Sequence, residues 1–135
     1  MLPLDYPKRW RFAGIFLLIS AFGVAIAPEI WPWSQNRGLD WFPNDKWAHG
    51  FTFALLAIWY SGQYARRSYW WLALGLLIFG ALIEACQSMV TYRTAETGDL
   101  IADALGIAAG ISIGLIGVGG WSLRVESWLQ SDPTR

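Results

Sequence analysis

Four stretches of the sequence are apolar over lengths close to what a helix needs to cross a lipid bilayer. They run from Phe12 to Ala27, Trp47 to Tyr60, Trp70 to Val90 and Leu100 to Trp121. Crossing about 30 Å of hydrocarbon takes roughly 20 mostly apolar helical residues. The last two stretches reach this length and the first two approach it. We therefore predict an all-α integral membrane protein whose four transmembrane helices form one bundle.

The composition agrees with a lipid environment. Hydrophobic residues make up 55% of the 135 residues and charged residues 15%, against about 25% charged residues in a typical soluble domain. The chain is long enough for one domain, so we treat residues 1–135 as a single membrane domain. Its ten basic and ten acidic residues balance, which argues against a nucleic-acid partner.

The N-terminus resembles a secretory signal in one respect. Lys8, Arg9 and Arg11 precede the first apolar stretch, which closes on the small-residue pattern Ala25-Ile26-Ala27. Signal peptidase tolerates proline poorly at the first mature position, which Pro28 would occupy. We therefore interpret this stretch as an uncleaved first transmembrane helix.

The distribution of basic residues predicts the orientation. Seven basic residues lie on one side of the predicted spans: Lys8, Arg9, Arg11, Arg66, Arg67, Arg124 and Arg135. Three lie on the other side: Arg37, Lys46 and Arg93. Because basic loops stay in the cytoplasm, we predict that both termini are cytoplasmic, with residues 122–135 as a short tail. The loop from Pro28 to Asn44 is then external.

Polar residues interrupt three of the spans near their outer ends. Asp45 and His49 are four residues apart, Asp99 and Asp103 are four apart, and Glu84 and Gln87 are three apart. Residues at these spacings share one face of a helix. At 1.5 Å rise per residue, His49, Glu84 and Asp103 lie roughly 6 to 9 Å inside the outer ends of their helices. Since ionisable residues in a membrane normally face a bundle interior or wet cavity, we expect one outer polar pocket.

The outer layer carries more acids than bases. Its six acids are Asp40, Asp45, Glu84, Glu96, Asp99 and Asp103, against three bases. Crowded carboxylates raise one another's pKa, so shared protons or a bound cation would have to compensate. The sequence contains no zinc-binding helix motif or phosphate-binding glycine loop. We therefore assign no metal ligands and no cofactor from sequence.

Small residues recur every four positions along the fourth stretch, at Gly98, Ala102, Gly106, Gly110 and Gly114. Such a stripe lets a second helix approach closely. We interpret it mainly as a packing surface inside the bundle. A helix-mediated oligomer through Gly106, Gly110 and Gly114 is the alternative use.

Several polar residues allow a structural and a functional interpretation. Asp45 and Asp99 sit where a first-turn acid stabilises a helix N-terminus. His49 is either a satisfied buried histidine, bonded to Asp45 or Glu84, or a base or ligand. Arg93 could clamp a phosphate or pair with Asp99. Glu84 has no local structural role, which favours a function.

These same residues resemble the pattern of the VanZ-like family of bacterial membrane proteins. The pattern is Asp45, Lys46 and His49, then Glu84 and Gln87, then Arg93, then Asp99, Asp103 and Gly106. The resemblance extends from Asn44 to Gly114 and implies a multi-pass protein of the bacterial inner membrane. Many members carry asparagine where this chain has Asp103. The better-known members are linked to resistance against the glycopeptide teicoplanin, which implies a role at the cell envelope.

Two functions follow as hypotheses. In the first, the pocket binds, and in an enzymatic version modifies, a membrane lipid or lipid-linked envelope precursor. His49, Glu84 and Asp103 would be catalytic, with His49 as a base oriented by Asp45. The substrate-binding residues would be Asp45, Lys46, Gln87, Arg93 and Asp99. In the second, the polar cluster is structural, and the protein is an accessory or lipid- or drug-sequestering module. A carrier or channel ranks last, because the inner halves of the spans carry almost no ionisable residues.

Overall fold

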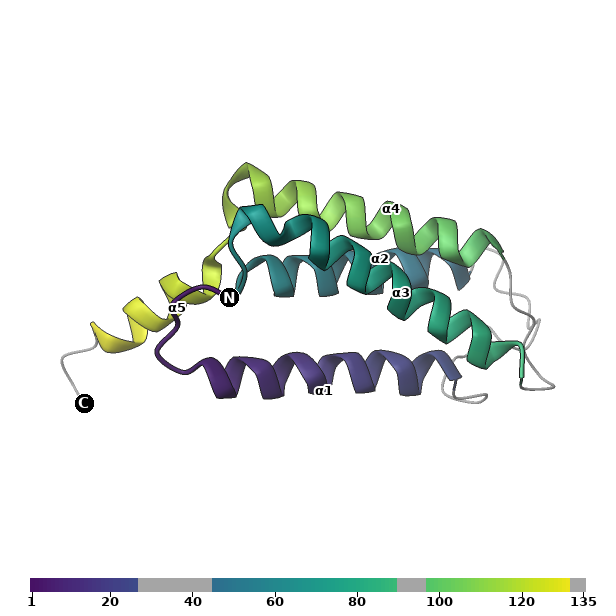
Figure 1. The fold of residues 1–135 in the computed structure, drawn as a ribbon, viewed down its shortest axis with the longest axis horizontal. Coiled ribbons are helices and arrows are strands. Elements are labelled where there is room, and N and C mark those ends of the chain that lie inside the picture. The colour runs from purple at the N-terminus through teal and green to yellow at the C-terminus, as the bar shows by residue number, and fades with distance from the viewer. Residues whose placement is uncertain (27–44, 90–96, 132–135) are drawn as a thin grey trace, which may run out of the picture.

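The computed structural model describes residues 1–26, 45–89 and 97–131, and every regular element within these ranges is helical. Helix α1 is Pro7–Ile26, α2 is Asp45–Ser61, and α3 is Tyr69–Gln87, preceded by a 3₁₀ turn at Arg66–Ser68. Helix α4 is Thr97–Ile113 and continues as a π-helical turn at Gly114–Val118. Helix α5 is Trp121–Gln130 (Figure 1).

Three of the described helical segments are long and apolar enough to cross a membrane. They are Pro7–Ile26, Arg66–Gln87 and Thr97–Val118, of 20, 22 and 22 residues. Helix α2 has 17 residues and lies against α4 in the same bundle. The all-helical, membrane-type fold predicted from sequence is therefore confirmed.

The helix ends follow from local sequence. Pro7 is the first residue of α1, where its fixed φ suits a helix and its missing N–H costs no hydrogen bond. The last span ends at Val118, whereas the fourth apolar stretch was expected to continue to Trp121. Gly117 has a φ of 150° and Gly120 a φ of 74°, which glycine adopts at little steric cost. The chain therefore turns there and starts α5.

The closest helix packing in the bundle is between α2 and α4. A Cβ atom at Gly106 would overlap the backbone of Gly50, and one at Gly110 would lie 2.5 Å from the backbone oxygen of Ala54. The small-residue stripe thus brings α4 onto α2 of the same chain. The use of this stripe in a helix-mediated oligomer stays a prediction.

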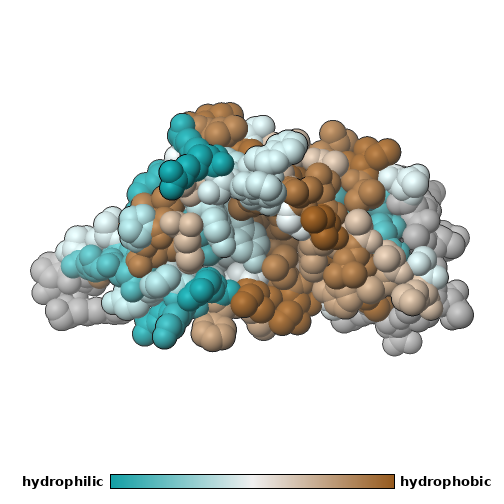
Figure 2. Space-filling view, in the orientation of Figure 1, coloured by the Kyte–Doolittle hydropathy of each residue, from teal (hydrophilic) through white to brown (hydrophobic). Residues whose placement is uncertain are grey.

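The apolar core lies where α2, α3 and α4 meet. Its fully buried members are Phe53, Leu56, Ala57, Leu76, Ile83 and Ile107. Helix α1 runs alongside this group (Figure 1) and leaves Phe12, Phe16 and Ile19 more than 60% exposed. Figure 2 shows hydrophobic side chains across the middle of the molecule and hydrophilic ones towards the end that holds α5. This banding suits a molecule surrounded by lipid.

Helix α5 forms a hydrogen-bonded clasp with the N-terminal segment. The Glu126 carboxylate accepts hydrogen bonds from the backbone N–H of Asp5 at 2.8 Å and of Tyr6 at 3.1 Å, and from the indole N–H of Trp10 at 2.7 Å. Burial alone would raise the pKa of Glu126, but these three bonds outweigh it and hold that pKa below its usual value. Residues 122–130, which belong to the segment 122–135 expected only as a short tail, are thus part of the folded structure.

Candidate functional site

A cluster of polar side chains lies at the end of the bundle opposite the two termini. Lys46 and His49 come from the first turns of α2, Glu84 from the last turns of α3, and Asp99 and Asp103 from the start of α4. His49, Asp99 and Asp103 are 7%, 4% and 0% exposed. These side chains from α2, α3 and α4 lie near one another, and the outer polar pocket expected from their similar depths stays a prediction.

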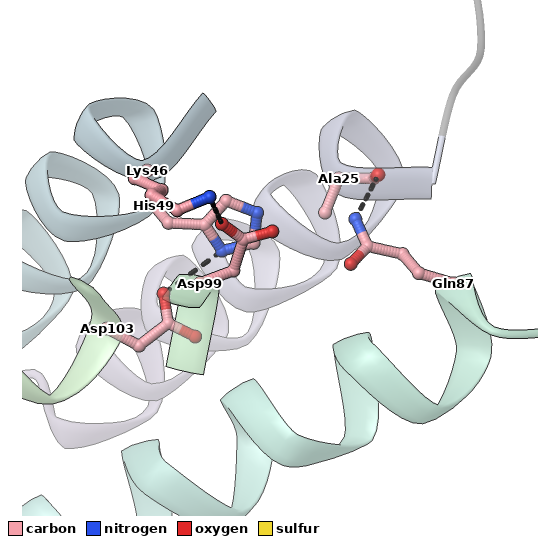
Figure 3. Close-up of polar contacts among 6 residues, drawn as sticks. All are labelled: Ala25, Lys46, His49, Gln87, Asp99 and Asp103. Atoms are coloured by element: carbon pink, nitrogen blue, oxygen red, sulfur yellow. Dashed lines mark hydrogen bonds and ion pairs between the residues drawn. The ribbon is translucent and has the colours of Figure 1, made fainter. Parts of the chain in front are cut away.

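His49 is held by Asp103, one turn inside α4. The Nδ1 atom of His49 lies 3.1 Å from Oδ1 of Asp103 (Figure 3), and both side chains are buried. An ionised Asp103 can only accept, so Nδ1 carries the proton in this pair and Nε2 keeps its lone pair when the ring is neutral. The sequence analysis expected Asp45 or Glu84 beside His49 and did not identify Asp103 as its partner.

A second contact between the same two helices involves Lys46 and Asp99. The Nζ atom of Lys46 lies 3.7 Å from Oδ1 of Asp99 (Figure 3). The Lys46 side chain is 44% exposed, whereas Asp99 is buried. Lys46 therefore places a positive charge at the edge of the cluster, from which it can reach an anionic group outside.

Glu84 completes the cluster from the third helix. One donor atom from each of His49, Glu84 and Asp99 lies within 4.8 Å of the other two. Glu84 itself is half-buried. A base, a carboxylic acid and a cation thus lie within one small space, a combination that proton transfer on a bound anionic group can use.

Gln87 has a different position from the one expected. Its side-chain amide donates a 2.9 Å hydrogen bond to the backbone oxygen of Ala25, in the last turn of α1 (Figure 3). This contact fastens the end of α1 to α3. A role for Gln87 in binding substrate stays a prediction.

Two predicted site residues fall outside the described parts of the chain. Arg93 lies in the 90–96 range, and the Asp45 side chain is not described although the residue begins α2. The loop from Pro28 to Asn44 is also outside the described residues.

An apolar groove of about 510 Å³ runs between α1 and α2 and reaches His49. Its walls include Leu17, Ala21, Val24, Thr52, Leu56 and Ile83, and Trp59 and Trp121 also line it. The volume is within the usual range for small-molecule sites. No pattern in the sequence predicts this groove, because it depends on the distance between α1 and α2.

The comparisons with known proteins identify the family of the chain. Searches of curated proteins and of solved structures found no significant match. A family model described as VanZ/LLP1 matches residues 10–118, a range that includes the five clustered residues Lys46, His49, Glu84, Asp99 and Asp103. With most of its length matched, this membrane-type chain belongs to the VanZ/LLP1 family.

Proposed function

We propose that the protein binds a lipid-linked or cell-envelope substrate at the outer leaflet of the bacterial inner membrane, with its polar group at the His49 cluster. The observation that carries the proposal is the groove that ends on His49. Its apolar walls suit a hydrocarbon chain, and the buried polar cluster at its end suits the headgroup of the same molecule. Lys46 and Arg93 supply positive charge for an anionic headgroup.

The proposed topology has four membrane-spanning helices, α1 to α4, and cytoplasmic termini. Basic residues at the end of the bundle that holds the termini support it: Lys8, Arg9, Arg11, Arg66, Arg67 and Arg124. At the opposite end, Lys46 is the basic residue among those described. This imbalance follows the positive-inside rule and leaves the polar cluster on the outer side.

In the enzymatic version, the His49–Asp103 pair provides a general base. Asp103 orients the ring and stabilises its protonated form, so that Nε2 can take a proton from water or from a substrate hydroxyl. Glu84 can return a proton to the leaving group. Lys46, with Arg93, would stabilise negative charge that develops on the headgroup.

The test uses one groove variant and one matched control. In Ala21→Phe a phenyl ring is added to the groove wall, whereas in Ala81→Phe the same group is added at an exposed position of α3 outside it. Both proteins are reconstituted in phosphatidylglycerol nanodiscs containing a polyprenyl phosphate, and bound lipid is measured by native mass spectrometry. We expect Ala21→Phe to lose bound polyprenyl phosphate and Ala81→Phe to keep it. Equal binding by both variants contradicts the proposal.

The second candidate function is a non-catalytic accessory or sequestering module. It is favoured by the direct bond between His49 and Asp103, which joins α2 to α4 as a structural brace would. The two candidates differ in a cell expressing the protein. Suppose that the protein confers teicoplanin resistance. If it acts by handling a substrate, His49→Ala and Glu84→Gln should each abolish that resistance. In the accessory function, variants that still reach the membrane keep it.

A further inference from the structure

We infer that His49, Glu84 and Asp99 form a binding site for a divalent transition-metal ion, with Zn²⁺ as the best-matched candidate. One imidazole nitrogen and two carboxylate oxygens converge from three different helices, within 4.8 Å of one another. Ligand bonds to zinc are about 2.0 to 2.2 Å. Donors on opposite sides of one ion are then about 4.4 Å apart at most, so small side-chain rotations bring this set onto one ion.

An independent observation at Asp103 supports the metal site. Histidine ligands usually donate their second ring N–H to a carboxylate, which fixes the ring and strengthens the metal bond. Asp103 occupies that position, with Oδ1 3.1 Å from Nδ1 of His49, and it is 0% exposed. Its second oxygen, Oδ2, has no hydrogen-bond partner among the described residues. Burying this carboxylate is costly without nearby positive charge, and an ion bound on the far side of the His49 ring would supply that charge.

The donor set also indicates the class of ion. Imidazole favours zinc and other first-row transition metals over Mg²⁺ and Ca²⁺, and two carboxylates suit a divalent ion. Three protein ligands are the usual number in catalytic zinc sites, which keep a fourth position open. Because His49 also lines the apolar groove, water or an anionic headgroup could reach that fourth position from the groove.

With an ion bound, His49 would act as a ligand instead of a base. Its Nε2 lone pair would lie on the metal, and the metal would provide the charge that the headgroup meets. This role in headgroup chemistry rests on the proposed function, whereas binding of the ion does not. The ion would also join α2, α3 and α4 through one ligand each.

The experiment measures metal content in the purified, detergent-solubilised full chain. The protein is stripped with EDTA, equilibrated with Zn²⁺ and freed of excess ion, and bound zinc is measured by inductively coupled plasma mass spectrometry. We expect about one zinc per chain, as for a site with three protein ligands, together with a higher melting temperature than in the stripped protein. Co²⁺ in place of Zn²⁺ should give the visible absorption of a bound, non-octahedral ion.

Variants locate the ion. Glu84→Gln and Asp99→Asn each remove one ligand charge and should lose bound zinc. Glu126→Gln makes the same chemical change in the clasp at the other end of the molecule and should keep it. Asp103→Asn leaves the three ligands in place and should weaken zinc binding by roughly 10- to 100-fold.

The outcomes separate this inference from the proposed function. Zinc far below one per chain in the unmodified protein, or equal zinc in Glu84→Gln and Glu126→Gln, overturns the metal site even if polyprenyl phosphate still binds. Zinc binding that depends on these ligands, without any binding of polyprenyl phosphate, supports the metal site and contradicts the proposed function. If the metal site is overturned, shared protons among the carboxylates would compensate the acidic charge in place of zinc.

Discussion

Replacing Gly110 with alanine adds one methyl group where α4 packs closely against the backbone of α2. The new Cβ would lie 2.5 Å from the backbone oxygen of Ala54 and 2.7 Å from the Cβ of Ala57. An ordinary contact between carbon and a carbonyl oxygen is about 3.3 Å or longer. Backbone atoms cannot rotate away as a long side chain can, so α4 must move outward by about 0.8 Å.

The free-energy change can be estimated from this displacement. A gap of 0.5 to 1 Å loses about a quarter to a half of the dispersion energy of each separated atom pair. Overpacking of this kind typically costs about 1 to 3 kcal/mol. The greater helix propensity of alanine offsets this overpacking cost by at most roughly 1 kcal/mol. We therefore expect Gly110→Ala to lower the free energy of unfolding by about 1 to 2 kcal/mol.

Gly75→Ala is the matched control, because a Cβ at Gly75 meets nothing within 4 Å. It should leave the free energy of unfolding unchanged or raise it by up to roughly 1 kcal/mol. Both variants are unfolded in mixed micelles of increasing SDS content, with helix content followed by circular dichroism. If Gly110→Ala and Gly75→Ala unfold at the same SDS fraction, the described close packing of α2 and α4 is wrong.

Three further predictions concern hydrogen bonds. Glu126→Gln should lower the melting temperature at pH 7. The pKa of Glu126 is lowered on folding, so the ionised carboxylate stabilises the fold above its unfolded pKa of about 4.3, and this stabilisation is lost as pH falls through the folded pKa. The difference in melting temperature between Glu126→Gln and the unmodified protein should therefore shrink in acid. A difference that stays constant with pH contradicts these hydrogen bonds. Asp103→Leu, measured without added metal, should cost about 1 to 3 kcal/mol because it leaves the buried His49 Nδ1 without its acceptor; unchanged melting would show that the pair is not formed. Gln87→Leu should cost about 1 kcal/mol and speed proteolysis near the end of α1, whereas cleavage at the unmodified rate would argue against the Gln87–Ala25 bond.

The positions of the helices follow closely from hydrophobicity, and their ends do not. The second apolar stretch was expected from Trp47 to Tyr60, and α2 is Asp45–Ser61. The first begins five residues earlier than expected, at Pro7, because basic residues at a membrane surface extend a helix without being apolar. Helix α5 was not anticipated, since a short amphipathic helix has no long apolar stretch and its order depends on Glu126 meeting the N-terminal segment.

The candidate site was predicted in part. The depth of each polar residue along its helix follows from the rise per residue, and this predicted His49, Glu84 and Asp103 at a similar level, whereas the three closest donors in the structure are those of His49, Glu84 and Asp99. Spacing within one helix does not tell which face of another helix lies opposite it. For this reason the sequence suggested Asp45 or Glu84 as the partner of His49, whereas the structure adds Asp103, 54 residues away along the chain.

The fastening of α1 at both of its ends has a consequence for how molecules enter from the side. At one end, the indole of Trp10 is bonded to Glu126, and at the other end Ala25 accepts the bond from Gln87. Between these two ends, α1 and α2 are separated by the groove. Helix α1 is therefore bonded to its neighbours at both ends, and the groove lies beside the turns between them. A chain-bearing molecule that entered the groove between α1 and α2 would leave both bonds in place and would stay within the hydrocarbon layer.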